Sequence, residues 1–317
     1  MRILVTGATG FAGGHLIDLL LKRGGSEIVG IARHAPWPVP LQHLADRVTL
    51  VACDASDRAA LENLLHERRP EQIYHLAGYA HAGQSFREQD AAWAGNLGAS
   101  RALYDAVIRW GGKPRILFVG SGLIYGDPER PDQSYDESSP LRPNSPYAAS
   151  KAAADLASYQ YTRSPGLDIV RARPFNHVGP RQSPQYAVAH FAEQIAAAER
   201  GRRPPLLETG NLMALRDLTD VRDVAEAYTL LMERGRTGEA YNVATGTAHS
   251  MQTIVDRLVG LGRVSVEMRQ RPDLLRARDT SAVRGDSSKL RSETGWQPRI
   301  ALETTLQDTL DYWRQQA

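Results

Sequence analysis

Three glycines near the start of the chain constrain its fold more than any other feature. They lie in the run Thr6-Gly7-Ala8-Thr9-Gly10-Phe11-Ala12-Gly13, between an apolar segment at Ile3–Thr6 and a segment of helical period at Ala12–Leu21. Glycines at this spacing permit a tight strand-to-helix turn and let the backbone approach a pyrophosphate, which the helix N-terminus attracts through its N–H groups and dipole. A glycine-rich loop without a ligand is the alternative, but the place between a strand and a helix favours a dinucleotide site.

The pattern downstream predicts a parallel sheet covered by helices. Short, nearly continuous apolar runs alternate with longer segments of helical period up to about residue 173, as is typical of strands buried on both faces. The expected fold class is therefore an α/β, Rossmann-type, doubly wound parallel sheet. We expect strands at Ile3–Thr6, Ile28–Ala32, Val48–Val51, Ile73–Leu76, Ile116–Val119 and Asp168–Arg171, and helices at Ala12–Leu21, Arg58–His66, Ala91–Ile108 and Ser145–Tyr161.

Chain length and a change of pattern after Arg173 predict a second lobe. The chain has 317 residues, more than a single hydrophobic core usually serves. Beyond Arg173 the sequence becomes irregular and rich in Pro, Gly and Arg. We expect residues 1–173 and 219–245 to form the dinucleotide-binding domain, and residues 174–218 and 246–317 to form a smaller, mixed α/β C-terminal lobe that binds the substrate.

Composition excludes several classes of protein. The 38 Lys and Arg against 36 Asp and Glu give a formal net charge of +2, too small for a typical nucleic-acid-binding domain. Cys53 is the single cysteine, so we expect no intrachain disulfide, no Cys-based metal site and a reducing, cytoplasmic compartment. We assign no residue to a metal. No apolar stretch approaches the roughly 18 residues of a membrane span, and we expect neither a secretion signal nor an anchor. A local excess of Arg between Arg257 and Arg299 suits a small polyanionic ligand, or is a solvated surface.

The residue after the second predicted strand indicates which dinucleotide is bound. Sites for NAD usually carry an acid there, whereas this chain has Arg33, which can hold a 2′-phosphate. NADP(H) is therefore favoured, with a solvated surface arginine as the alternative. After the third strand, the carboxylate of Asp54 can accept a hydrogen bond from the adenine amino group. Leu76-Ala77-Gly78 bring small side chains and bare backbone to the end of the fourth strand.

A Tyr-x-x-x-Lys pair carries the chemistry that we expect. Tyr147 and Lys151 are four residues apart and so lie on one face of a helix. A tyrosine phenol titrates near pH 10, so a fixed cation that stabilises its phenolate suits proton exchange at neutral pH. Ser121 follows the strand Ile116–Val119 at the edge where open α/β sheets bind ligands, and its hydroxyl can bond a substrate oxygen. Each residue alone has a structural explanation, but their combination with the glycine turn favours a catalytic site.

The glycine turn, Ser121, Tyr147 and Lys151 together resemble the extended short-chain dehydrogenase/reductase family, whose members act on nucleotide sugars. The resemblance extends from Arg2 to about Trp313. Within the family the chain is most similar to bacterial GDP-4-keto-6-deoxy-D-mannose reductases. The stretches that carry this likeness are Ser145-Pro146-Tyr147, Arg173-Pro174-Phe175-Asn176-His177-Val178-Gly179-Pro180, Gly210-Asn211-Leu212, Arg216-Asp217-Leu218-Thr219-Asp220-Val221-Arg222-Asp223, Tyr241-Asn242-Val243 and Thr294-Gly295-Trp296-Gln297-Pro298.

The resemblance implies which residues contact the ligands. Asn176 would bind the sugar nucleotide, and Arg216 and Arg276 would reach its diphosphate, unless they are surface charges. Ala277 stands where the family usually has Pro after that Arg, so this loop departs from the family pattern at that position. The implied substrate-binding set is Ser85, Ser121, Asn176, Arg216, Arg276 and Asp279, and the cofactor-binding set is Gly7, Thr9, Gly10, Phe11, Ala12, Gly13, Arg33, Asp54, Ala55, Leu76, Ala77, Gly78, Tyr147, Lys151 and Pro174.

The residues after Ser121 bear on the reaction. Resembling dehydratases carry an acid directly after the hydroxyl residue, whereas this chain has Gly122-Leu123. We therefore expect NADPH-dependent reduction of the C4 ketone of a 4-keto-6-deoxy nucleotide sugar, GDP-4-keto-6-deoxy-D-mannose being converted to GDP-D-rhamnose or its 4-epimer. A nucleotide-sugar 4-epimerase, a dTDP- or UDP-sugar reductase and a non-catalytic NADP-binding regulator are the alternatives. The resemblance also implies a homodimer formed by the helices at Ala91–Ile108 and Ser145–Tyr161.

Overall fold

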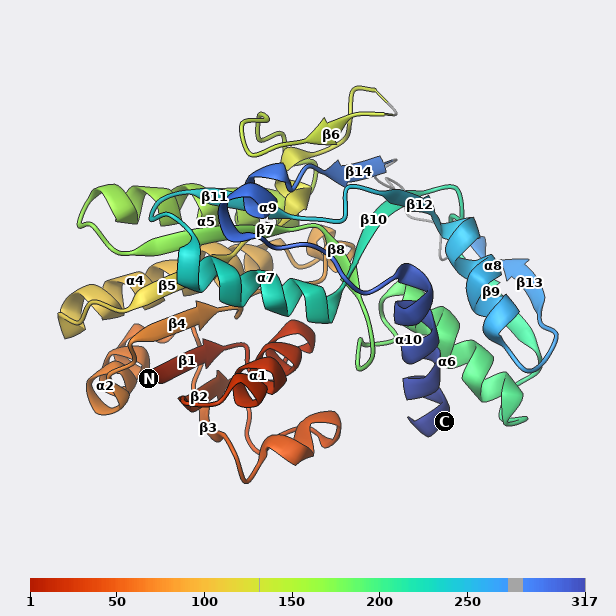
Figure 1. Ribbon diagram of the computed structural model, residues 1–317, viewed down its shortest axis with the longest axis horizontal. Helices are drawn as coiled ribbons and strands as arrows, with labels where there is room; N and C mark the ends of the chain where they lie inside the picture. The colour runs from red at the N-terminus through yellow and green to blue at the C-terminus, as the bar shows by residue number, and fades with distance from the viewer. Residues whose placement is uncertain (131, 273–281, 317) are drawn as a thin grey trace.

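The computed structural model describes residues 1–130, 132–272 and 282–316, and its core is a seven-stranded sheet (Figure 1). Every neighbouring pair is parallel, in the order β11-β7-β5-β4-β1-β2-β3. The order reverses between β1 and β4, and ligands of doubly wound folds bind at such a switch point. The predicted Rossmann-type sheet is thus confirmed. Its strands are β1 (Arg2–Thr6), β2 (Glu27–Ala32), β3 (Thr49–Ala52), β4 (Gln72–His75), β5 (Arg115–Val119), β7 (Ile169–Pro174) and β11 (Ala240–Val243).

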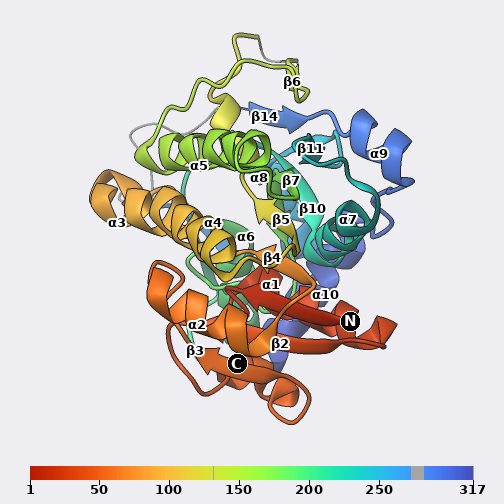
Figure 2. The same ribbon diagram turned by 90° about the vertical axis from the view of Figure 1, so that its left-hand side faces the viewer.

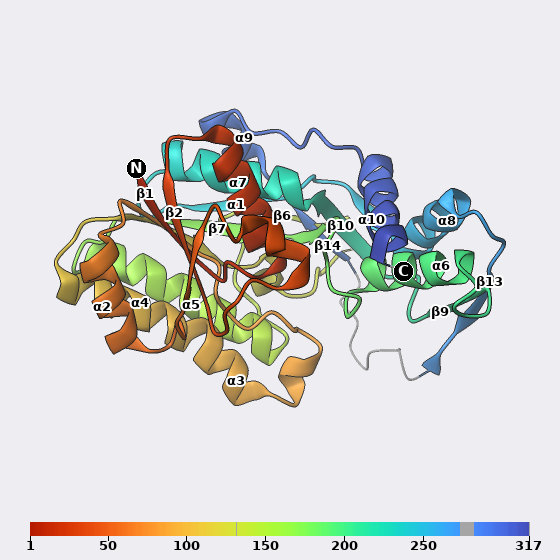
Figure 3. The same cartoon turned by 90° about the horizontal axis from the view of Figure 1, so that it is seen from below.

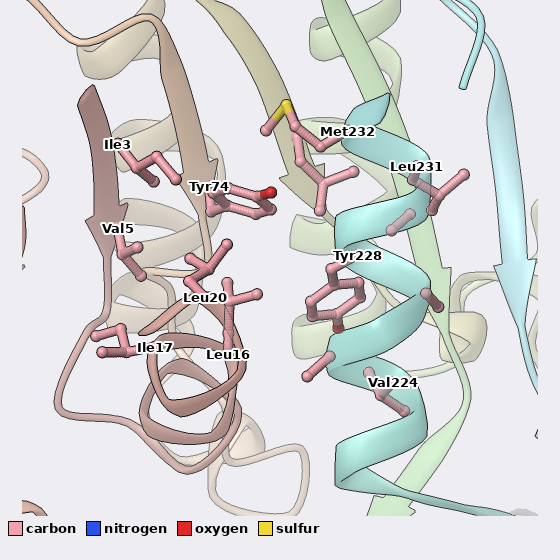
Figure 4. Close-up of a cluster of buried hydrophobic side chains, with 14 of the residues drawn as sticks. Ile3, Val5, Leu16, Ile17, Leu20, Tyr74, Val224, Tyr228, Leu231 and Met232 are labelled. Carbon is pink, nitrogen blue, oxygen red and sulfur yellow. The ribbon is translucent and has the colours of Figure 1, made fainter. Parts of the chain in front are cut away.

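Helices cover both faces of this sheet (Figure 2). On one face, α1 (Phe11–Arg23) packs beside α7 (Val221–Arg234); on the other lie α2 (Arg58–Arg68), α4 (Ala99–Trp110) and α5 (Pro146–Arg163). Figure 4 shows the first face, where Leu16 and Leu20 of α1 and Tyr228 of α7 lie on the side of Tyr74 of β4. Burial of each large apolar side chain of this kind contributes roughly 1.5–3 kcal/mol to the free energy of unfolding.

The helix predicted at Ala91–Ile108 is divided in the structure. It comprises α3 (Gln89–Trp93), a π-helical turn at Ala94–Gly98, and α4. The spacing of apolar residues predicts one continuous helix here. A single wide turn adds only one residue to the helical repeat, and the apolar spacing of the sequence does not reveal it. Such turns occur frequently at functional sites, and this one buries the polar side chain of Asn96.

The other strands build smaller sheets above the carboxyl edge of the large one (Figure 1). β10 (Leu215–Asp220) pairs antiparallel with β12 (Ala248–Ser250) and parallel with β8 (Asn176–Val178) and β14 (Ala282–Gly285). β14 also pairs with β6 (Ser134–Tyr135), and β9 (Leu206–Thr209) pairs with β13 (Glu267–Gln270).

Three helices form a second hydrophobic core beside these strands. α6 (Ala187–Glu199), α8 (Met251–Leu261) and α10 (Leu302–Gln316) bury Phe191, Ile195, Leu258 and Leu306 against one another. Figure 3 shows them grouped at one end of the molecule, away from α2 and α4. α9 (Ser288–Thr294) instead packs on α7 and β11. The mixed α/β second lobe is therefore present, while its predicted residue limits stay a prediction.

In the described part of the chain, no helix is both long and apolar enough to cross a membrane. The described residues also contain no cluster of three or more His, Cys, Asp or Glu side chains suited to a metal ion.

Candidate active site

The glycine turn joins β1, α1 and the end of β4 at very close range. Gly7 has a positive φ of 68°, and a Cβ there would lie 2.9 Å from the backbone nitrogen of Ala77. A Cβ on Gly13 would lie 2.3 Å from the Gly7 carbonyl oxygen. Gly10 caps α1 without a side-chain hydrogen bond, so the N–H groups of the first turn, from Phe11 onward, remain for an anion. This cradle fits a diphosphate.

A buried hydrogen-bond chain fixes the ends of β1 and β4. The hydroxyl of Thr6 lies 2.9 Å from His75 Nδ1 and accepts the backbone N–H of Ala77 at 2.9 Å. The other ring nitrogen of His75 contacts the Ser100 hydroxyl at 3.1 Å. Burial lowers the pKa of His75 to about 3, so its ring is neutral at physiological pH. The chain thus holds Ala77 against the glycine turn.

Arg33 and Asp54 lie at the ends of β2 and β3, as the sequence predicted for the adenosine side of the cofactor. Arg33 is exposed, and Asp54 accepts hydrogen bonds from the backbone and the hydroxyl of Ser56 at 2.8 and 2.7 Å. These bonds, and more weakly the charge of Arg33, lower the pKa of Asp54. Ala55 beside it is buried. This part of the site therefore combines the exposed guanidinium of Arg33 with the carboxylate of Asp54, which Ser56 holds in place.

Ser121, Tyr147 and Lys151 meet at the carboxyl end of β5. Ser121 opens a 3₁₀ turn and accepts the Leu123 N–H at 3.2 Å. It also hydrogen-bonds the phenol of Tyr147, in the first turn of α5. One turn later, the ammonium of Lys151 donates to the Val119 carbonyl at 3.1 Å. The structure therefore brings together the three residues that the sequence selected for catalysis.

Burial dominates the titration of this group. It raises the pKa of Tyr147 to about 12, against the lowering effect of the Ser121 hydrogen bond, and it lowers the pKa of Lys151 to about 8. The sequence predicted that Lys151 would lower the pKa of Tyr147. In the structure burial outweighs any such effect, and the phenol is protonated at neutral pH.

Asn96 is a site residue that the sequence analysis missed. Its Oδ1 accepts the Tyr79 N–H at 3.0 Å, and its Nδ2 donates to the Ser150 hydroxyl at 2.9 Å. A Cβ on Gly78 would lie 2.7 Å from Asn96 Oδ1 and 3.2 Å from Lys151 Nζ. Gly78 thus leaves backbone beside the ammonium. An asparagine inside an otherwise apolar helix was the available indication, but only the π-helical turn shows where its side chain points.

Tyr186, which caps α6 in the second lobe, was also missed. Its hydroxyl donates to the Ala80 carbonyl at 3.2 Å, and its ring stacks on His81 with centroids 5.9 Å apart. Its proximity contributes to the raised pKa of Tyr147. The second lobe therefore reaches the neighbourhood of Tyr147 through an aromatic side chain. The contact joins segments about a hundred residues apart, and no local pattern indicates it.

The residues predicted to bind substrate are only partly gathered. Asn176, on β8, pairs with Leu218 of β10 just beyond the buried Pro174. Arg216, on β10, is partly buried and donates to the Leu215 carbonyl at 2.8 Å. Ser85 is buried, and its hydroxyl bonds the Ala82 carbonyl and the Tyr147 N–H. Arg276 and Asp279 lie outside the described residues. The roles assigned to these residues stay predictions.

Known proteins share this architecture over the whole chain. The model of the GDP-mannose 4,6 dehydratase family matches residues 4–309. GDP-6-deoxy-D-mannose reductase of Pseudomonas aeruginosa is 32% identical, covering 98% of this chain and 97% of the reductase. UDP-glucose 4-epimerase of Mycolicibacterium smegmatis is also 32% identical, covering 99% of both chains. The solved structure of RMD from Pseudomonas aeruginosa complexed with NADPH has a TM-score of 0.86 at 30% identity, covering 100% of this chain and 99% of that one.

These relatives confirm the resemblance that the glycine turn and the Ser121, Tyr147 and Lys151 group indicated. They include a reductase and an epimerase, both acting on nucleotide sugars by their names. The chain belongs to the GDP-mannose 4,6-dehydratase family of nucleotide-sugar enzymes, within the oxidoreductase-type extended short-chain dehydrogenases/reductases.

Proposed function

We propose that this enzyme reduces the C4 ketone of a 4-keto-6-deoxy nucleotide sugar with NADPH, and that its substrate is GDP-4-keto-6-deoxy-D-mannose. The product is GDP-D-rhamnose or its 4-epimer. One observation carries the choice of a reductase over a dehydratase. A Cβ on Gly122, directly after Ser121, would lie 2.7 Å from the ring of Phe175. A carboxylate side chain does not fit there, so the proton carrier that elimination needs at this position is missing.

The glycine turn supports a dinucleotide cofactor, and Arg33 supports NADP(H). The uncapped first turn of α1 would hold the diphosphate, and the exposed guanidinium of Arg33 suits a 2′-phosphate. RMD, the similar solved structure, contains NADPH. When bound, the reduced cofactor supplies a hydride. Because the reduced form serves as a consumable reductant, net reduction of a ketone is the favoured outcome.

Ser121, Tyr147 and Lys151 would each have a different role at the sugar carbonyl. The Ser121 hydroxyl polarises the ketone oxygen, and the phenol of Tyr147 gives its proton to the alkoxide that forms at C4. Burial keeps this phenol protonated at pH 7, ready to donate. Lys151 would hold the nicotinamide ribose and place a positive charge beside the phenolate that remains. A water or bulk proton then restores Tyr147.

The substrate's nucleotide would lie over the second lobe. We assign Asn176 and Arg216 to the sugar nucleotide, since both lie on the β8–β10 pair next to the carboxyl edge of the large sheet. The likeness to GDP-6-deoxy-D-mannose reductase favours a GDP-linked sugar. We further propose a cytoplasmic homodimer whose interface is α4 and α5, because the apolar side chains of Ile108, Leu156 and Tyr159 are exposed there.

An epimerase is the second candidate, favoured by the likeness to UDP-glucose 4-epimerase of Mycolicibacterium smegmatis. One assay distinguishes these functions. Purified protein is incubated with NADPH and a panel of GDP-, dTDP- and UDP-linked 4-keto-6-deoxy sugars, and the absorbance of the reduced cofactor is followed. We expect oxidation of NADPH with the GDP-linked sugar. Turnover only with another base corrects the substrate, sugar inversion without net oxidation identifies an epimerase, and inactivity across both assays favours a non-catalytic regulator.

A further inference from the structure

Ser85 lies against α5, the helix of Tyr147, and the Ser85 hydroxyl uses most of its hydrogen-bonding capacity within the protein. It is fully buried in a 3₁₀ turn at Gln84–Phe86. Its hydroxyl donates to the Ala82 carbonyl at 2.7 Å and accepts the backbone N–H of Tyr147 at 3.2 Å. A serine hydroxyl has one hydrogen to donate. Ser85 therefore has no second donor for a substrate oxygen while it holds Ala82.

The first turn of α5 shows why this bond matters. Pro146 has no N–H, and the N–H groups of Ala148 and Ala149 are satisfied by the side chain and carbonyl of Ser145, at 3.2 and 2.8 Å. The N–H of Tyr147 is instead satisfied by Ser85, from a segment outside the helix. The bond therefore ties the backbone of the catalytic tyrosine itself to the turn at Gln84–Phe86.

The carbonyl side of Tyr147 is tied in the same manner. It accepts the Ser150 hydroxyl at 2.8 Å, and that hydroxyl accepts the side-chain amide of Asn96 at 2.9 Å. The backbone of Tyr147 is thus held between two serine hydroxyls, each fixed by a different segment of the chain. No other function is needed to explain why a polar side chain is buried at position 85.

We propose that Ser85 is a positioning residue that sets the place of the Tyr147 phenol through its backbone N–H. The inference rests on the proposed function, because it assumes that this phenol is the proton donor. A misplacement of about 1 Å at a reacting group can cost about 100-fold in rate. Loss of the Ser85 hydroxyl therefore lowers kcat and leaves the binding of the nucleotide sugar nearly unchanged.

Ser85→Ala tests this, with Ser158→Ala as the matched control. Ser158 is as buried as Ser85 and lies on α5, the helix that carries Tyr147. Its hydroxyl contacts the Ala154 carbonyl and the Tyr104 hydroxyl, both at 2.7 Å. Both variants lose a buried hydroxyl with two hydrogen bonds. We expect Ser85→Ala to lower kcat by about 10- to 100-fold at nearly constant KM, and Ser158→Ala to keep kcat. Ser85→Cys, which keeps the size but is a weak acceptor, should fall between.

A second measurement does not depend on turnover. In protein labelled with ¹³C at tyrosine Cζ, the Tyr147 resonance is assigned with Tyr147→Phe and titrated in each variant. A displaced phenol changes both its burial, which raises its pKa, and its bond to Ser121, which lowers it. We therefore expect the pKa to shift in Ser85→Ala and to stay at the wild-type value in Ser158→Ala. If the wild type reduces no sugar in the panel, the proposed function fails. The titration still tests whether the bond from Ser85 to the Tyr147 N–H positions the phenol.

Two outcomes overturn the inference. A rise in KM with unchanged kcat in Ser85→Ala would mean that Ser85 contacts the substrate directly. Equal losses of kcat in Ser85→Ala and Ser158→Ala would mean that the helix merely tolerates no missing hydroxyl, without a specific role for position 85.

Discussion

At the scale of single residues, the proposed chemistry rests on the phenol of Tyr147. Because burial keeps it protonated and Ser121 hydrogen-bonds it, Tyr147→Phe removes the proposed proton donor without emptying the site. We expect kcat to fall by about 10²- to 10⁴-fold, with nearly native affinity for NADPH and the sugar nucleotide, measured by steady-state kinetics and calorimetric titration. Tyr159→Phe, an exposed tyrosine of the same helix, is the control and should keep full turnover. Unimpaired turnover in Tyr147→Phe would remove this residue from the mechanism.

His75 gives a prediction about pH at the same scale. Burial lowers its pKa to about 3, against about 6.5 in an unfolded chain. As the pH falls below 6.5, the unfolded chain binds a proton that the native protein does not, so the free energy of unfolding decreases until the pH passes 3. At pH 5 this residue should account for a loss of about 2 kcal/mol relative to pH 8.

Urea unfolding at pH 5 and pH 8 checks this loss. We expect His75→Gln to lose less stability than the wild type between the two pH values, because its side chain does not titrate. His15, whose pKa burial lowers to about 4, is present in both proteins and cancels in the comparison. Equal losses in the two proteins would mean that His75 does not carry the effect.

At the scale of elements, the contact between β1 and α1 depends on Gly13. A Cβ there would lie 2.3 Å from the Gly7 carbonyl oxygen, so Gly13→Ala pushes the helix away from the turn that would hold the diphosphate. We expect a destabilisation of about 1–3 kcal/mol and an NADPH affinity at least about 10-fold weaker, equivalent to about 1.4 kcal/mol, measured by fluorescence titration.

Gly260→Ala is the control for that substitution. Gly260 is also helical, in α8, and has open space where its Cβ would lie. The alanine should therefore stabilise the protein slightly, through helix propensity, and leave NADPH binding unchanged. An unchanged affinity in Gly13→Ala would contradict the assignment of this turn to the cofactor.

At the scale of the whole molecule, the proposed interface makes the next prediction. Leu156 is 57% exposed on α5, and α4 and α5 lie side by side on the outer surface of the sheet (Figure 2). Leu156→Glu should convert a dimer into a monomer in analytical ultracentrifugation, because a second copy would bury the new charge without a partner. Met213→Glu, at a more exposed site away from these helices, should leave the assembly unchanged. A monomeric wild type would refute the interface directly.

The sequence by itself determined the parallel sheet and indicated the Ser121, Tyr147 and Lys151 group that the structure brings together, because both depend on local patterns. Buried parallel strands require continuous apolar runs, and the glycine turn and the Tyr147/Lys151 pair are fixed by spacing along one segment. The tertiary structure decided what depends on contacts between distant segments: the π-helical turn at Asn96, the approach of Tyr186 from the second lobe, and the bond from Ser85 to Tyr147. The raised pKa of Tyr147 belongs with these, because the burial that causes it is created only when the chain has folded around the phenol.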